Sequence, residues 1–246
     1  LYSLALSNNN INSIQAGSFN NLNKLKELKL SYNLLQELNS GMFLGLDNLT
    51  KLDLDDNKIS EISYNTFEHL ENLEILKLEY NFILTIEPFT FAKLTFLTEL
   101  YLSKNKLNKI TVNMFTGLHN LKRLKLSENK IASIENNSFI DLNSLQHLSL
   151  SLNRLKSLEF GTFFGLKNLV TIDLSNNQLQ RIDNRTLEGV ELLEDIDLSG
   201  NPLDEYIEKN VFNQFRKSIN SLNLSFIEAN PSDFINFSLF EELVTL

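Results

Sequence analysis

Residues 97–120 read LTELYLSKNKLNKITVNMFTGLHN, and this stretch decides the fold. It begins with the pattern Leu-x-x-Leu-x-Leu-x-x-Asn-x-Leu, and a phenylalanine follows ten residues after the asparagine. The segment that follows directly, 121–144, repeats the frame as LKRLKLSENKIASIENNSFIDLNS. A fixed period of about 20–50 residues is typical of solenoid proteins, in which each repeat forms one supersecondary unit.

The same frame continues in both directions from this stretch. The asparagine recurs once per repeat at a constant interval, at Asn9, Asn33, Asn57, Asn81, Asn105, Asn129, Asn153, Asn177 and Asn201. Nine 24-residue repeats therefore occupy residues 1–200. After an irregular 26-residue step we expect a tenth repeat at about 219–242 and the start of an eleventh. Ile227 takes the place of the asparagine in that tenth repeat.

The spacing predicts one short strand per repeat. In Leu-x-Leu the side chains alternate, so both leucines point inward and the residues between them point outward. Successive strands then stack into one parallel sheet, and the phenylalanine column fills the core behind it. The asparagine amide can satisfy backbone groups where the chain turns inward after the strand. We predict a structural ladder of Asn33, Asn57, Asn81, Asn105, Asn129, Asn153 and Asn177 in a single domain, 1–246.

These motifs resemble the leucine-rich repeat family, and in particular its typical 24-residue class of animal extracellular proteins. Toll-like, Slit-like and chaoptin-like repeat regions are similar. The resemblance implies an α/β repeat solenoid shaped like a horseshoe, with a parallel sheet on the concave face and short irregular or helical segments on the convex face. Family members of this class usually carry Cys-rich caps. The absence of cysteine favours an internal fragment that lacks both caps.

Composition excludes several functional classes. The net charge of the 246 residues is −9, which disfavours nucleic-acid binding. Without cysteine there is no disulfide framework, no Cys-based zinc site and no thiol nucleophile. No apolar run approaches the ~20 residues of a membrane span, so membrane attachment would need segments outside this chain. We expect no metal and no cofactor.

The outward positions of the strands are the candidate binding positions. Tyrosine and isoleucine on a solvated sheet resemble the anchors of a protein interface, and the neighbouring basic side chains would attract an acidic protein surface or an acidic glycan. The predicted ligand-binding residues are Tyr32, Ile75, Lys77, Tyr80, Tyr101, Arg123 and Lys125. Their predicted partner is a protein ligand or a second copy of the receptor.

Two charge patterns on the predicted sheet lead to further expectations. Lys29 and Lys77 flank Asp53 in one column, which predicts a cross-strand ladder of ion pairs. Asp173 and Asp197 occupy equivalent positions on neighbouring strands, where like charges repel. We expect only water, a cation or a basic partner to offset that repulsion.

Catalysis is not expected. His147 lies near Ser149 and Asp173 on the predicted sheet, but no nucleophile turn, oxyanion site or pocket is suggested. The serine also belongs to a repeating column, and no glycine-rich phosphate loop is present. The sequence therefore predicts a non-enzymatic chain.

The N-x-Ser/Thr motifs at Asn136, Asn184 and Asn48 are candidate glycosylation sites. Their number is what chance gives in a chain so rich in Asn, Ser and Thr, so they carry no evidence for secretion. The resemblance favours a protein-recognition module that forms the ligand-binding or adhesion part of an extracellular or cell-surface receptor. The alternatives are a structural or self-associating extracellular scaffold and an intracellular leucine-rich-repeat scaffold.

Overall fold

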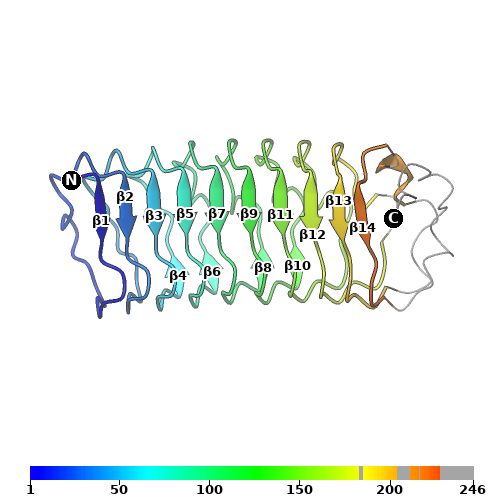
Figure 1. The fold of residues 1–246 in the computed structure, drawn as a ribbon, viewed down its shortest axis with the longest axis horizontal. Coiled ribbons are helices and arrows are strands. Elements are labelled where there is room, and N and C mark those ends of the chain that lie inside the picture. Colours follow the sequence, from blue (N-terminus) through cyan, green and yellow to red (C-terminus); the bar gives the residue numbers. More distant parts are fainter. Residues whose placement is uncertain (183–184, 204–210, 216, 228–246) are drawn as a thin grey trace.

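The computed structural model describes residues 1–182, 185–203, 211–215 and 217–227. Ten short parallel strands lie side by side in chain order along the long axis of the molecule (Figure 1). They are β1 (Ser3–Ala5), β2 (Glu27–Lys29), β3 (Lys51–Asp53), β5 (Ile75–Lys77), β7 (Glu99–Tyr101), β9 (Arg123–Lys125), β11 (His147–Ser149), β12 (Thr171–Asp173), β13 (Asp195–Asp197) and β14 (Ser221–Asn223). The predicted solenoid with one parallel sheet is confirmed.

The sheet register follows the sequence period. Leu100 of β7 pairs with Leu76 of β5 and Leu124 of β9, each exactly one repeat away in the sequence. These central leucines are fully buried, while their strand neighbours are half exposed. From β13 to β14 the register step is longer than one repeat, since Ile196 pairs with Leu222. The outward side of this ten-stranded sheet is called the sheet face below.

The phenylalanine column forms the centre of the core, as predicted. The rings stack from one turn to the next, with centroid distances of 6.1 Å for Phe43–Phe67 and 6.0 Å for Phe67–Phe91. Phe115, Phe139 and Phe163 form a second stacked run. Because each turn buries its apolar side chains against its neighbours, stability in such a solenoid comes from the contacts between turns.

The return segments are irregular rather than helical. In the described residues they consist of turns, the 3-10 helix Asn213–Phe215 and two pairs of two-residue strands. β4 (Glu61–Ile62) pairs with β6 (Thr85–Ile86), and β8 (Lys109–Ile110) pairs with β10 (Ser133–Ile134). No helix among the described residues is long and apolar enough to cross a membrane.

The ladder asparagines join consecutive turns through hydrogen bonds. Asn105 Nδ2 donates to the carbonyl of Leu78 on the preceding turn at 2.8 Å and to that of Leu102 on its own turn at 3.1 Å. Its Oδ1 accepts from the backbone N–H of Ile83 at 3.0 Å. Seven other asparagines repeat this arrangement: Asn33, Asn57, Asn81, Asn129, Asn153, Asn177 and Asn201.

A second asparagine column supports the return side. Asn48 and Asn72 donate to backbone carbonyls of the preceding turn, at 2.8 and 2.7 Å. Asn120 and Asn168 make the equivalent bonds. Phe96 occupies this position on the turn between Asn72 and Asn120, where its ring is 58% exposed. The sequence analysis did not identify this column.

Candidate functional site

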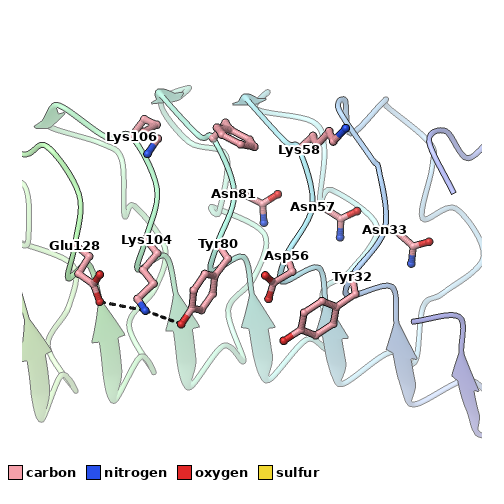
Figure 2. Close-up of a pocket in the computed structure, with 11 residues that line it drawn as sticks. Tyr32, Asn33, Asp56, Asn57, Lys58, Tyr80, Asn81, Lys104, Lys106 and Glu128 are labelled. Carbon is pink, nitrogen blue, oxygen red and sulfur yellow. Dashed lines mark hydrogen bonds and ion pairs between the residues drawn. The ribbon is translucent and has the colours of Figure 1, made fainter. Parts of the chain in front are cut away.

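The residue immediately before each ladder asparagine has a left-handed backbone. On five consecutive turns these residues are Tyr32, Asp56, Tyr80, Lys104 and Glu128, with φ between 52° and 57°. The shared backbone conformation presents their side chains in one line where the strands end (Figure 2). We call these five residues the edge row.

An open depression of about 710 Å³ lies along the edge row. Its lining also includes the ladder residues Asn33, Asn57 and Asn81 and, each directly after a ladder asparagine, Lys58, Phe82 and Lys106. The side chains of Tyr32, Tyr80 and Phe82 are 57%, 48% and 53% exposed. Three large aromatic rings therefore face solvent within one depression. At the equivalent positions, the directly neighbouring turns carry polar or charged side chains.

Lys104 is held between Tyr80 and Glu128 in the edge row. Its Nζ donates to the Tyr80 hydroxyl at 2.6 Å, lies 4.3 Å from the centroid of the same ring, and is 3.4 Å from Glu128 Oε1. The hydrogen bond to Tyr80 and the charge of Glu128 raise the pKa of Lys104. Lys104 therefore stays charged and fixes the orientation of Tyr80.

Asp56 differs from the other charged members of the edge row. None of the ion pairs formed by the described residues includes its carboxylate. Its negative charge raises the pKa of the neighbouring Tyr32, so the Tyr32 hydroxyl stays protonated at neutral pH. Asp56 is half-buried and lies between Tyr80 and Tyr32 (Figure 2).

The predicted residues Ile75 and Lys77 lie elsewhere, on the sheet face. They line a second depression of about 300 Å³ with Lys29 and Asp53. Lys29 and Lys77 do flank Asp53 in the sheet register, but the predicted ladder of ion pairs is wrong. Lys29 Nζ lies 3.3 Å from Glu27 Oε1 on its own strand, and the ion pairs of the described residues do not include Asp53.

Tyr101, Arg123 and Lys125 occupy the middle of the sheet face. The Tyr101 hydroxyl donates to Glu99, and burial together with this bond raises the pKa of Tyr101 to about 12. Lys125 Nζ lies 5.4 Å from the Tyr101 ring centroid. Tyr101 is thus half-buried and held by its neighbours, and it lies outside the edge-row depression.

The acidic pair near the C-terminal end corrects another expectation. Asp173 and Asp197 are direct neighbours in the register, as predicted, but local groups stabilise both. Asp173 accepts from the Ser149 and Ser175 hydroxyls at 3.1 and 2.7 Å. Asp197 accepts from the Ser199 hydroxyl at 2.6 Å and from Asn223 Nδ2 at 3.0 Å. Hydrogen bonding within the sheet therefore offsets the repulsion.

His147 and Ser149 are not arranged as a catalytic pair. His147 Nδ1 lies 2.8 Å from Thr171 Oγ1, whereas the Ser149 hydroxyl donates to Asp173. Burial and the charge of Arg123 lower the pKa of His147. Within the described ranges, no group of three or more His, Cys, Asp or Glu side chains could hold a metal ion.

The glycosylation candidates differ in their surroundings. Asn48 and Asn136 are both exposed on the return side. The Asn48 amide nitrogen donates to the Asn23 carbonyl at 2.8 Å. Asn184 lies outside the described residues, and so does most of the tenth repeat expected at 219–242.

Sequence reasoning placed Tyr32 and Tyr80 on this surface but missed much of the depression. It did not predict a binding role for Asp56, Lys58, Phe82, Lys106 or Glu128. A comparison within columns would have found Phe82, because lysine stands at the equivalent positions 58, 106 and 130. An aromatic residue that replaces a repeated lysine is a signal that the sequence carries.

Comparison with known families identifies the repeat. The leucine rich repeat model matches residues 1–59, 47–107, 95–155 and 147–203. The chain belongs to the leucine-rich-repeat family. Comparison with curated protein sequences gives no significant match.

Solved structures show the same fold. One similar chain comes from the Drosophila Toll–Spatzle complex, described as a molecular hub in development and innate immunity. It superimposes with a TM-score of 0.73 at 22% identity, and the match covers 100% of this chain but 36% of the Toll–Spatzle chain. Because 459 solved chains match, the likeness defines an architecture rather than one ligand.

Proposed function

We propose that the chain is the ligand-recognition part of an extracellular or cell-surface leucine-rich-repeat protein, and that it binds a protein ligand without catalysis. The edge-row depression carries this proposal. Three exposed rings, Tyr32, Tyr80 and Phe82, stand in a depression of about 710 Å³. Aromatic side chains grouped in a hollow and surrounded by charges are typical of interface anchors.

The class of the repeat supports the extracellular or cell-surface location. The uninterrupted 24-residue frame with its phenylalanine resembles animal extracellular repeats, and the fold is shared with a chain of the Toll–Spatzle complex. The exposed N-x-Ser/Thr motif at Asn136 is compatible with a secretory route. Attachment to a membrane would use segments outside this chain.

A binding screen with designed surface variants tests the proposal. The chain, secreted from animal cells, is presented as multimers to a panel of purified extracellular proteins. Tyr80→Asn and Phe82→Lys are then combined in one variant. Asparagine tolerates the left-handed backbone of residue 80, and lysine is the column residue at position 82. We expect the affinity for a bound partner to fall at least tenfold.

Phe89→Asn is the matched control. Phe89 is 52% exposed on the same turn but lies outside the depression, and its φ of 65° suits asparagine. The control should bind as the wild type does. A partner bound equally by the Tyr80/Phe82 variant, or a panel without any partner, would contradict the proposal.

Self-association is the second candidate function, and one observation favours it. Leu84, Phe89 and Phe96 are 48%, 52% and 58% exposed on the turn that also carries Tyr80 and Phe82. Exposed apolar side chains grouped on one turn can pack against a second copy. Light scattering across a concentration series should then show a dimer that Phe89→Asn with Phe96→Asn dissociates. A wild type that stays monomeric would eliminate this candidate.

A further inference from the structure

Asp56 is the one carboxylate of the edge row without a cation. Glu128 is paired with Lys104, and Lys104 in turn contacts Tyr80. Lys58 lines the same depression, but no ion pair joins it to Asp56, and it lies on the other side of the depression (Figure 2). The Tyr32 hydroxyl interacts with the Asp56 carboxylate, but none of the ion pairs of the described residues gives that carboxylate a cation, and a half-buried carboxylate is costly without a positive group.

The two neighbours of Asp56 in the edge row are tyrosines. Tyr32 lies one turn before it and Tyr80 one turn after it, so the rings start from positions about 10 Å apart at the usual strand spacing. Because Asp56 lies between the two tyrosines (Figure 2), a cation bound to it can reach either ring within the range of a cation–π contact, about 6 Å from the ring centroid. Lys104 already contacts Tyr80 in this way, at 4.3 Å from the ring centroid.

We propose that Asp56, flanked by Tyr32 and Tyr80, receives an arginine side chain of the protein ligand. The inference rests on the proposed function and adds the chemistry of its ligand. Arginine suits the site because a planar guanidinium stacks on aromatic rings and binds a carboxylate with two parallel hydrogen bonds. The net charge of −9 would also attract a basic ligand over longer distances.

Fluorine NMR on the full chain tests this site with a small arginine compound in place of a protein ligand. Incorporation of 3-fluorotyrosine labels all six tyrosines, and Tyr32→Phe and Tyr80→Phe assign the two signals of interest. The probe is N-acetylarginine methylamide. N-acetylcitrulline methylamide has nearly the same shape without the charge. We expect saturable shifts of the Tyr32 and Tyr80 signals with the arginine probe, and none with the citrulline probe.

Asp56→Asn is the decisive variant. Asparagine keeps the size of the side chain and tolerates its φ of 52°, so the fold is retained. The variant should weaken probe binding at least about fivefold. Asp47→Asn is the matched control, because it removes an exposed carboxylate outside the edge-row depression, and it should keep the shifts.

Two results would overturn the arginine site. Signals of Tyr32 and Tyr80 that do not move, or shifts that persist in Asp56→Asn, would each contradict it. A protein partner that still depends on Tyr80 and Phe82 would in that case leave the proposed function intact. The opposite outcome is also informative. If partner binding does not depend on Tyr80 and Phe82, but the arginine probe shifts only the Tyr32 and Tyr80 signals, the proposed protein interface is rejected and the arginine site is supported.

Discussion

At the residue scale, Asn105 shows how one side chain holds two turns together. Its replacement by alanine would leave the buried N–H of Ile83 without a partner, whereas the carbonyl of Leu78 would keep its bond from Asn81 Nδ2 at 3.2 Å. Because an unsatisfied buried polar group costs about 1–3 kcal/mol, Asn105→Ala should lower the free energy of unfolding by about 1–3 kcal/mol. Urea unfolding followed by circular dichroism measures the loss.

Asn9→Ala is the control for this prediction. Asn9 is exposed, and its amide donates to the carbonyls of Leu6 and Ser7 on its own turn. Its removal should cost less than about 1 kcal/mol. Equal losses at Asn9 and Asn105 would show that the bonds between turns do not stabilise the solenoid.

A second residue-scale prediction concerns pH. Burial and the nearby charge of Asp53 raise the pKa of Asp55 to about 7 from an ordinary value of 3.8. The folded chain therefore binds this proton more tightly than the unfolded chain, and stability falls as pH rises from about 4 to about 7. Asp55→Asn should flatten this dependence and add about 1–2 kcal/mol at pH 8, since solvent screens part of the effect.

The Asp55→Asn variant retains the local hydrogen bond. Asp55 Oδ1 accepts from the Glu79 N–H at 2.6 Å, and the asparagine oxygen can do the same. Thermal unfolding between pH 4 and 8 gives the comparison, with Asp47→Asn on an exposed turn as the control. A steeper pH dependence in Asp55→Asn than in the wild type would be the opposite of the expected result.

Single residues also show what the sequence could and could not reveal. The role of Asn105 follows from its period, because a buried turn in every repeat needs the same partner for its backbone. The role of Asp56 does not follow from the period, because the formation of an ion pair with its carboxylate depends on which neighbouring side chain reaches it. For the same reason the register predicted that Lys29 and Lys77 flank Asp53, but not that Lys29 pairs with Glu27.

At the element scale, Gly165 marks a close approach between two return segments. Its φ is +99°, and a Cβ there would lie 2.6 Å from Ile140 Cα. Gly165→Ala should therefore cost at least about 3 kcal/mol, because strain and overlap combine. Gly41→Ala, whose nearest neighbour would be 3.5 Å away at a φ of +73°, should cost about 1–2 kcal/mol. Denaturant midpoints of the two variants compare them directly.

The second asparagine column suggests a stabilising substitution at Phe96. Phe96→Asn would allow the new amide to donate to the carbonyl of Glu71, as Asn72 and Asn120 donate to their own partners. We expect a gain of about 0.5–1 kcal/mol over Phe96→Ser, which removes the ring without supplying the amide. Thermal unfolding of both variants isolates the hydrogen bond, and equal stabilities would show that the bond contributes nothing.

At the scale of the whole molecule, each turn contacts only its neighbours. Destabilisation of one central turn should therefore uncouple the unfolding of the two halves of the solenoid. Leu124 is fully buried in β9, and Leu124→Ala should cost about 2–5 kcal/mol as a core cavity. Hydrogen exchange should then show the two halves opening separately. Leu4→Ala, on the first strand, should loosen that end alone.

The fold could be predicted almost entirely from the sequence, since the period fixes the number and register of the strands. The candidate site could be predicted only in part. Tyr32 and Tyr80 followed from their columns, but the depression arises from the left-handed residues, whose backbone conformation the repeat pattern does not reveal. The irregular return segments likewise follow from packing between turns rather than from a local pattern.

The left-handed backbone also limits which variants of the edge row can exist. At all nine positions before the repeating asparagine, from Asn8 to Gly200, no valine, isoleucine or threonine occurs. Branching at Cβ strains a residue with positive φ, so these three side chains are excluded by the scaffold and not by any ligand. A combinatorial library of variants at these edge positions should therefore omit codons for β-branched residues. Substitutions to the other residue types at these positions would not disturb the core.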